Sequence, residues 1–154
     1  AMAQGKLHRY FMGYSASKTI LMIGLGVSSI SDSWYGFAQN VKSLEEYQNL
    51  ISHDLLPIFR GHILTSEDET IRKHILDLMC RYKTNFKQDK TDLKVYDQIK
   101  ENLKEMEKDG LVELESNTIQ VTASGRPYIR NICMAFDLKL HRKKPETRLF
   151  SMTV

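Results

Sequence analysis

The spacing of apolar residues changes at Gly110, and this change constrains the fold more than any other feature of the sequence. Before it, apolar residues recur at the three- and four-residue steps of one helical face: Leu93, Tyr96, Ile99, Leu103 and Met106. After it, residues 111–115 and 118–122 are strand-like runs separated by Ser116-Asn117, a pair suited to a tight turn. Gly110 suits the position just after a helix. We therefore expect a helix followed directly by a β-hairpin.

Two capping signals predict two further helices upstream. Ser43 with Glu46, and Ser66 with Glu69, have the three-residue spacing of a capping box. Pro57 is expected to end the first of these helices just before it. The second carries one apolar face, formed by Ile71, Ile75, Leu78, Met79 and Tyr82.

A last helix is expected after the segment 122–127. Its apolar face consists of Ile129, Ile132, Cys133, Phe136 and Leu140. Residues 60–62 are expected to form a loop and residues 85–90 a polar linker. Helix, helix, hairpin, helix is the order of a winged-helix-like unit, with the hairpin as the wing. The fold class is therefore α+β and mainly helical, with a winged-helix-like C-terminal domain.

The run 19–27 is short, apolar and interrupted by Gly24 and Gly26, which predicts a buried strand. A buried strand needs neighbours on both sides, and the sequence offers few other strands. We therefore expect residues 1–42 to be an arm that belongs to a barrel outside this chain, and residues 43–154 to form the helical domain. Apolar surface left exposed on the arm is expected to favour self-association.

Composition narrows the class of protein. The 154 residues are 42% hydrophobic and 27% charged, which is enough for a packed core. The net charge of +3 is too small to indicate nucleic-acid binding. No apolar run approaches the roughly 20 residues that span a membrane, and no signal-peptide pattern is present. We therefore expect a cytoplasmic protein without a nucleic-acid partner or a membrane span.

The spacing of cysteines and histidines predicts no metal site. Cys80 and Cys133 belong to no CxxC, CxxxCxxC or Cys/His pair, and both fall on apolar helix faces, where small buried side chains are expected. Four histidines likewise lack ligand spacing with one another: His53, His62, His74 and His141.

Several segments, in order along the chain, resemble motifs of one known family. They are 5–14 (GKLHRYFMGY), 24–31 (GLGVSSIS), 37–40 (FAQN), 60–65 (RGHILT), 109–112 (DGLV), 119–126 (IQVTASGR) and 129–137 (IRNICMAFD). Together they resemble the C-terminal region of the oxygen-independent coproporphyrinogen III oxidases, which are radical S-adenosylmethionine (SAM) enzymes. The last segment is the most specific, because it resembles the RNICM-x-FD signature of these oxidases. Tyr10 and Pro127-Tyr128 depart from the family pattern.

The resemblance implies that the parent enzyme oxidatively decarboxylates two propionates of coproporphyrinogen III to give protoporphyrinogen IX without oxygen. It also implies a [4Fe-4S] cluster and S-adenosylmethionine in the parent, which together supply a 5′-deoxyadenosyl radical. The family holds the cluster through a CxxxCxxC motif, which this sequence lacks. We therefore interpret the chain as a truncated piece of the larger enzyme. We expect it to be inactive alone, to bind neither cofactor alone, and to cover the active site in the parent.

Candidate cofactor-contacting residues also come from the resemblance. Ile30 matches the isoleucine of the family's GVSAIS segment, which contacts S-adenosylmethionine; an ordinary core role is the alternative. Gly24 and Gly26 would permit close approach of the backbone to the cofactor. Ser29 stands where a dinucleotide-binding fingerprint has its third glycine, so a Rossmann interpretation is rejected.

Candidate substrate residues lie near the start of the last helix, and none is expected to be catalytic. Arg126 and Arg130 are about one helical turn apart, and paired guanidinium groups suit the propionates of the substrate. Pairing with local acids or capping of the wing is the alternative, and we prefer it. Asn131 and Asp137 are expected to make helix-capping or interdomain hydrogen bonds.

Two other classes of function stay open. A haem-chaperone-like or non-catalytic interaction module would share the architecture, but the signature at 129–137 argues against it. A nucleic-acid-binding winged helix would use the helix after Thr91. Four positive and six negative residues between 92 and 109 give that helix the wrong sign of charge for binding phosphate.

Overall fold

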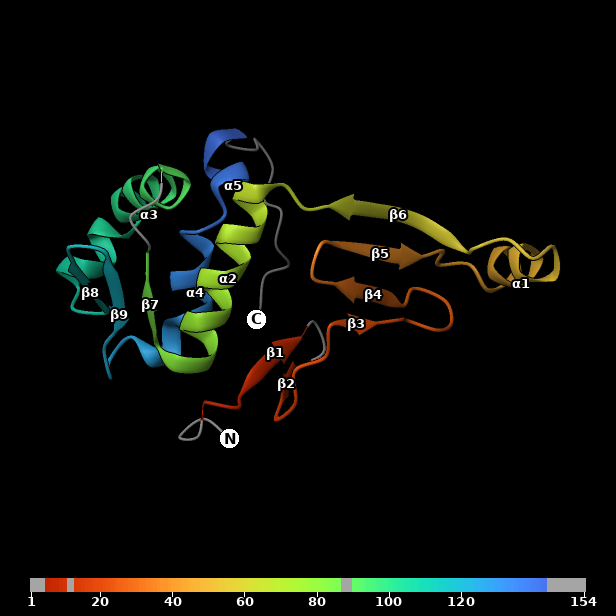
Figure 1. Cartoon of the computed structure of the whole chain (residues 1–154), viewed down its shortest axis with the longest axis horizontal. Coiled ribbons are helices and arrows are strands. Elements are labelled where there is room, and N and C mark those ends of the chain that lie inside the picture. Colours follow the sequence, from red (N-terminus) through yellow and green to blue (C-terminus); the bar gives the residue numbers. More distant parts are fainter. Residues whose placement is uncertain (1–4, 11–12, 87–89, 144–154) are drawn as a thin grey trace. The chain divides into compact units, whose positions relative to one another are not determined.

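The computed structural model in Figure 1 describes residues 5–10, 13–86 and 90–143. Phe11, Met12, the linker residues 87–89 and the C-terminal tail therefore lie outside the described part. The chain forms two compact units, Ala1–Glu69 and Thr70–Val154. The division into an arm of residues 1–42 and a domain of residues 43–154 stays a prediction.

The first unit is built mainly from short antiparallel strands. Its strands are β1 (His8–Tyr10), β2 (Gly13–Ser15), β3 (Leu21–Met22), β4 (Ile30–Ser33), β5 (Gly36–Asn40) and β6 (Ile58–Ile63). The first two strands pair with each other, and the other four form one sheet in the order β3-β4-β5-β6. The prediction of a loop at residues 60–62 is wrong, because this segment is part of β6 and pairs with β5.

The predicted buried strand at residues 19–27 is also wrong. Only Leu21 and Met22 pair as a strand, and Ile20 and Leu25 are 81% and 83% exposed. Beyond Met22, the Gly24 amide donates to the side-chain Oγ of Ser31, and Gly26, with a φ of +94°, turns the chain. Continuous apolar sequence indicated burial here, but no second layer of the described unit covers these residues.

Apolar side chains of the first unit are therefore largely exposed. Within its described residues, the buried apolar side chains are Val41, at 2% exposure, and Pro57. The exposed large hydrophobic residues include Ile20, Leu21, Ile23, Leu25, Leu56, Phe59 and Ile63. Four of these residues, Ile20, Leu21, Ile23 and Leu25, lie within residues 1–42, so the expectation of exposed apolar surface there is confirmed.

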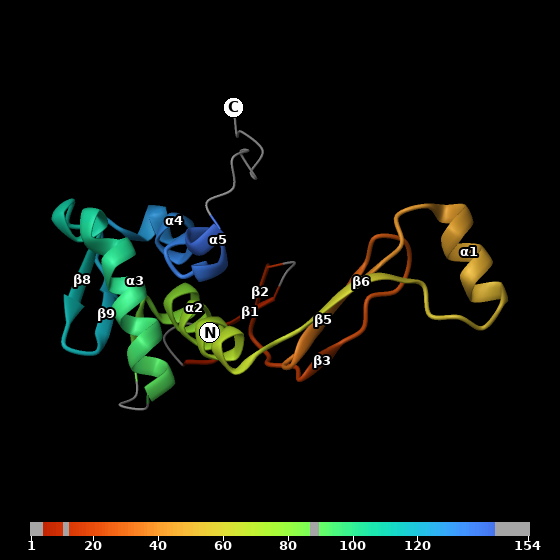
Figure 2. The ribbon, with the colours of Figure 1, turned by 90° about the horizontal axis from the view of Figure 1, so that it is seen from above.

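Helix α1 (Leu44–Ser52) lies in the connection between β5 and β6, beyond the ends of both strands in Figures 1 and 2. Ser43 caps it by accepting a 3.4 Å hydrogen bond from the Glu46 amide, as predicted. The helix ends at Ser52, before the predicted end at Pro57. Asp54, with a φ of +56°, turns the chain, and the Asp54 amide donates to a carbonyl of the last turn.

Helix α2 (Ser66–Arg81) begins one residue earlier than predicted, because its capping residue is Thr65 and not Ser66. The Asp68 amide donates to Thr65 Oγ1 at 3.2 Å, and the Thr65 amide donates to Asp68 Oδ2 at 3.0 Å. Thr65 and Asp68, not Ser66 and Glu69, therefore form the reciprocal cap. The predicted apolar face is confirmed, since Leu78 and Met79 are buried and the other members pack against the core.

Helix α3 (Lys90–Lys108) ends as the sequence predicts. Gly110 has a φ of +70°, and its amide donates to Glu107 O at 3.0 Å. The Leu111 amide reaches back to Met106 O at 2.9 Å, which completes a Schellman motif. Glycine is favoured here because a side chain disfavours this backbone conformation.

The predicted hairpin is confirmed as β8 (Val112–Glu115) and β9 (Thr118–Val121). Glu115 pairs with Thr118, so Ser116 and Asn117 form a two-residue turn. A third strand, β7 (Lys83–Asn85), pairs with β9 and was missed, because three polar or β-branched residues carry little sequence signal.

The predicted last helix is two helices, α4 (Ile129–Met134) and α5 (Leu138–Lys143), preceded by a 3-10 turn, η2 (Arg126–Tyr128). Asp137 starts the second one by accepting a 2.9 Å hydrogen bond from the Leu140 amide. The prediction of a single helix is wrong because the apolar spacing continues across the break between Met134 and Leu138. The helix-capping role expected for Asp137 is confirmed.

The second unit has one continuous core. Its buried members are Leu78, Phe86, Val95, Tyr96, Ile99, Leu103, Val112, Ile119, Val121, Ile132, Ala135, Phe136 and Leu138. Cys80 is buried and Cys133 packs partly buried against this cluster, as expected for small apolar side chains. Helices around a small antiparallel sheet confirm the α+β fold class.

Candidate functional site

Strand register gathers polar side chains on one face of the four-stranded sheet. Ile30 pairs with Gln39, and Gln39 pairs with Arg60. Two residues along, Phe37 pairs with His62. Partners in an antiparallel sheet point to the same side, as do residues two apart in one strand. These five side chains therefore share one face.

A hollow of about 460 Å³ lies on this face. Its lining comes from β4, β5 and β6 and consists of Ile30, Phe37, Ala38, Gln39, Arg60, Gly61 and His62. The lining is mostly apolar, with polar groups from three of these residues. Such a mixture suits a ligand that has an apolar body and a few polar or charged groups.

Arg60 is held at the hollow by a neutral partner. Its Nε donates a 2.9 Å hydrogen bond to Gln39 Oε1. The Gln39 amide in turn donates to Ser28 O at 3.3 Å. The guanidinium group is therefore oriented without being neutralised by this partner, and it keeps its positive charge toward a ligand.

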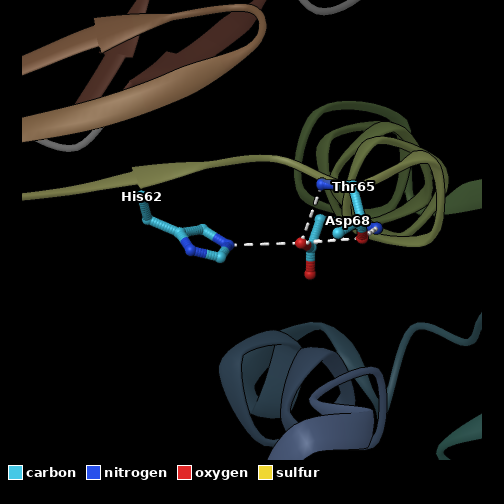
Figure 3. A network of polar contacts seen from close by, with 3 residues as sticks. All are labelled: His62, Thr65 and Asp68. Atoms are coloured by element: carbon cyan, nitrogen blue, oxygen red, sulfur yellow. Dashed lines mark hydrogen bonds and ion pairs between the residues drawn. The ribbon is translucent and has the colours of Figure 1, made fainter.

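His62 is held by an acid, as Figure 3 shows. Its Nε2 lies 3.2 Å from Asp68 Oδ2, and the same oxygen accepts hydrogen bonds from the amide and the hydroxyl of Thr65 at 3.0 and 2.9 Å. The Asp68 side chain is only 12% exposed, whereas the His62 side chain is 51% exposed. The helix cap therefore fixes an imidazole ring that remains accessible.

The sequence did not predict the pairing of Arg60 with Gln39 or of His62 with Asp68. The segment that carries Arg60 and His62 was expected to be a loop, and alternation across residues 58–63 was too weak to indicate a strand. One signal was available in the sequence. Phe37 and Gln39 are two residues apart, as are Arg60 and His62, and this spacing places each pair on one face of a strand.

The predicted cofactor residues lie together in the first unit. Ile30 is half-buried and lines the hollow. A Cβ atom added to Gly24 would lie 2.8 Å from Ile30 O, so glycine is needed there for the backbone to pass β4. The buried Asn40 holds the same loop by donating to Gly24 O and Gly26 O at 3.1 and 2.9 Å. Contact of these residues with S-adenosylmethionine stays a prediction.

The predicted substrate residues lie in the second unit. The Arg126 guanidinium lies 4.9 Å from the centre of the Tyr82 ring, a local cation–π contact. Arg130 is exposed on α4. A role for either in binding propionates stays a prediction, and the Tyr82 contact supplies a structural reason for Arg126.

Two further properties of the described residues concern metal ions and membranes. Among the described residues, no three His, Cys, Asp or Glu side chains are grouped so that they could hold a metal ion. In the same part of the chain, none of the helices combines the length and apolar character needed to cross a membrane.

Comparison with known proteins gives one consistent set of relatives. The chain is 38% identical over its whole length to oxygen-independent coproporphyrinogen III oxidase of Escherichia coli (strain K12), and covers 35% of that protein. It is 31% identical over its whole length to the protein of the same name from Synechocystis sp., again covering 35%. No family model matches the chain.

A solved structure shares the fold. It is coproporphyrinogen III oxidase from Escherichia coli, described as a radical SAM enzyme. The match has a TM-score of 0.80 and 35% identity, and covers 91% of this chain and 33% of the other. The fold and the sequence of this chain therefore match one region of a radical SAM enzyme.

Relatives that share one name are similar to this chain over its whole length, and this similarity shows its family. The chain belongs to the oxygen-independent coproporphyrinogen III oxidases, and it spans about a third of the length of these curated relatives. The resemblance found in the sequence motifs is thereby confirmed.

Proposed function

We propose that this chain is the C-terminal region of an oxygen-independent coproporphyrinogen III oxidase. In the complete enzyme, two propionate side chains of coproporphyrinogen III would each lose a hydrogen atom, carbon dioxide and one electron to become the vinyl groups of protoporphyrinogen IX. The observation that carries this proposal is similarity along the whole chain to relatives named for that reaction.

We propose that the chain contributes binding surface and not the radical itself. A [4Fe-4S] cluster and S-adenosylmethionine would supply a 5′-deoxyadenosyl radical when bound to the complete enzyme. The sequence has no CxxxCxxC motif to hold the cluster, so this chain alone is expected to be inactive. Ile30 is proposed to contact S-adenosylmethionine, as the matching isoleucine of the family's GVSAIS segment does.

The uncovered apolar side chains of the first unit support a role as part of a larger enclosure. Ile20, Leu25 and Ile63 are each more than four-fifths exposed. Surfaces of this kind mark contacts with further protein. We propose that the chain covers the active site of the complete enzyme. When separated from the rest of the enzyme, the chain is expected to self-associate. A cytoplasmic location without a nucleic-acid partner belongs to the same proposal.

A chimeric enzyme tests the proposal. The matching third of the Escherichia coli oxidase would be replaced by this chain, and protoporphyrinogen IX formation from coproporphyrinogen III would be measured without oxygen. We expect turnover by the chimera, and none by the same enzyme lacking this third or by this chain alone. A soluble chimera that is loaded with its cluster and does not turn over would contradict the proposal.

A binding comparison separates the proposal from the haem-chaperone alternative. The chain would be mixed with haem and with coproporphyrin III, and the Soret band would be followed. A shift with coproporphyrin III supports the oxidase. Tight haem binding with no response to coproporphyrin III supports the chaperone.

A further inference from the structure

We propose that Arg60 and His62 form a carboxylate-binding subsite for one propionate of a tetrapyrrole, whose apolar ring lies against Phe37. This inference rests on the proposed function and names two residues that would bind its substrate. It concerns the sheet face of the first unit and is separate from the candidates Arg126 and Arg130.

Geometry supports one shared site. Arg60 and His62 are two residues apart in β6 and therefore point to the same side. Ile30 and Phe37 reach that side from β4 and β5, and all four line one hollow of about 460 Å³. The hollow thus has cationic and hydrogen-bonding groups along one edge strand and apolar groups from the two inner strands. A propionate joined to a flat apolar ring has the complementary arrangement.

Electrostatics favours an anion at Arg60. The guanidinium group donates, through Nε alone, to the neutral side chain of Gln39. A guanidinium has five N–H donors, so this bond leaves four to meet a carboxylate, and the two-pronged geometry matches the two oxygens of that group. Within the described strands β3 to β6 the acidic residue is Asp32, which is buried at 7% exposure and lies on β4, two strands away from Arg60.

His62 adds a second, fixed polar group. Asp68 Oδ2 accepts three hydrogen bonds, two from Thr65 and one involving His62 Nε2. The negative charge of Asp68 is therefore balanced by hydrogen bonds from the helix cap and the imidazole. The ring is thereby held in one orientation at the hollow, which reduces the ordering cost of binding a ligand there.

The test uses the full chain and coproporphyrin III, the stable oxidised tetracarboxylic porphyrin, followed by its Soret band and fluorescence. The matched ligand is coproporphyrin III tetramethyl ester, whose carboxylates are blocked. Arg60→Gln removes the guanidinium, Arg60→Lys keeps its charge without the fork, and His62→Asn removes the imidazole. Lys42→Gln, an exposed residue of the same unit, is the control for lost charge.

We expect Arg60→Gln to weaken binding of the free acid about tenfold, the size of one charge-assisted hydrogen-bond pair, and His62→Asn to weaken it severalfold. Arg60→Lys should lose less, and Lys42→Gln should bind like the original chain. The ester should bind more weakly to the original chain and should not distinguish Arg60→Gln from it.

Three results would overturn the subsite: no binding of the acid, equal loss of acid and ester on Arg60→Gln, or no loss with Arg60→Gln and Arg60→Lys. The proposed function can fail separately. An inactive chimera with Arg60-dependent acid binding contradicts the oxidase and keeps the subsite. An active chimera whose binding of the free acid does not depend on Arg60 supports the oxidase and contradicts the subsite.

Discussion

His74 and Thr84 are joined by a 2.7 Å hydrogen bond between Nδ1 and Oγ1 inside the second unit. Both residues are buried, at 0% and 2% exposure. The bond links α2 to β7, the strand that the sequence did not predict. The His74 ring also stacks on Phe86 with 3.7 Å between ring centres. A polar contact between two consecutive elements therefore positions part of the core.

Replacing Thr84 by valine is expected to lower the free energy of unfolding by about 1–3 kcal/mol, because a buried polar atom of His74 loses this partner. Thr84→Ser keeps the hydroxyl and should cost clearly less. Urea denaturation followed by circular dichroism would measure both variants. A valine variant as stable as the original chain would show that this bond contributes nothing.

The start of α2 gives a prediction that separates the structure from the sequence pattern. Thr65→Ala removes the observed cap and should destabilise the chain by about 1 kcal/mol. Ser66→Ala should be neutral or slightly stabilising, because Ser66 is inside the helix and alanine is the better helix former. The two midpoints of denaturation would be compared. A lower midpoint for Ser66→Ala than for Thr65→Ala would show that Ser66 caps the helix, as the sequence suggested.

Gly125 is required by close packing. A Cβ atom at this position would overlap the carbonyl oxygen of Leu111, although the φ of −79° is open to any residue. Gly125→Ala is therefore expected to lower the free energy of unfolding by about 1–3 kcal/mol, the usual cost of overpacking. Ser124→Ala, at the exposed neighbouring position, is the control and should change stability little. Equal midpoints for the two variants would contradict this account.

Tyr96 should make stability fall at high pH. Burial raises the pKa of Tyr96 above its usual value of 10.0, and the charges of Asp97 and Glu107 raise it further. Above pH 10 the unfolded chain therefore loses the phenolic proton before the folded chain does, which favours unfolding. Its contribution to stability is present below pH 10 and is lost as the pH rises through the raised value.

Tyr96→Phe is the matched comparison for this pH dependence. The variant removes the phenol and its 3.0 Å hydrogen bond to Glu115 O. Its free energy of unfolding should be lower than that of the original chain at neutral pH and should decline less between pH 9 and 11. Parallel declines in the two proteins would show that other groups cause the loss.

The proposed function also predicts a feature of the gene. Upstream of the codon for Ala1, the intact reading frame should encode three cysteines spaced CxxxCxxC, since the radical chemistry needs them. Sequencing of the genomic locus would check this. An intact reading frame without such a triplet would remove the enzymatic assignment.

Local sequence determined much of the second unit. Residues 93–106 repeat at helical spacing, Gly110 supplies the backbone conformation that ends α3, and Ser116-Asn117 suits a two-residue turn. Each of these features depends on neighbours within a few residues, so the chain carries its signal directly. The family motifs behaved in the same way, because they are short and keep their order.

Tertiary structure decided the features that depend on partners far along the chain. Strand β6 exists because β5 pairs with it, and this pairing brings Arg60 and His62 to the face that carries Ile30. The shortness of β3 could not be predicted either, because its pairing with β4 stops at Met22 although the apolar run continues to Val27. The sequence alone therefore determined the local elements and the family. Long-range strand pairing decided which side chains form a site.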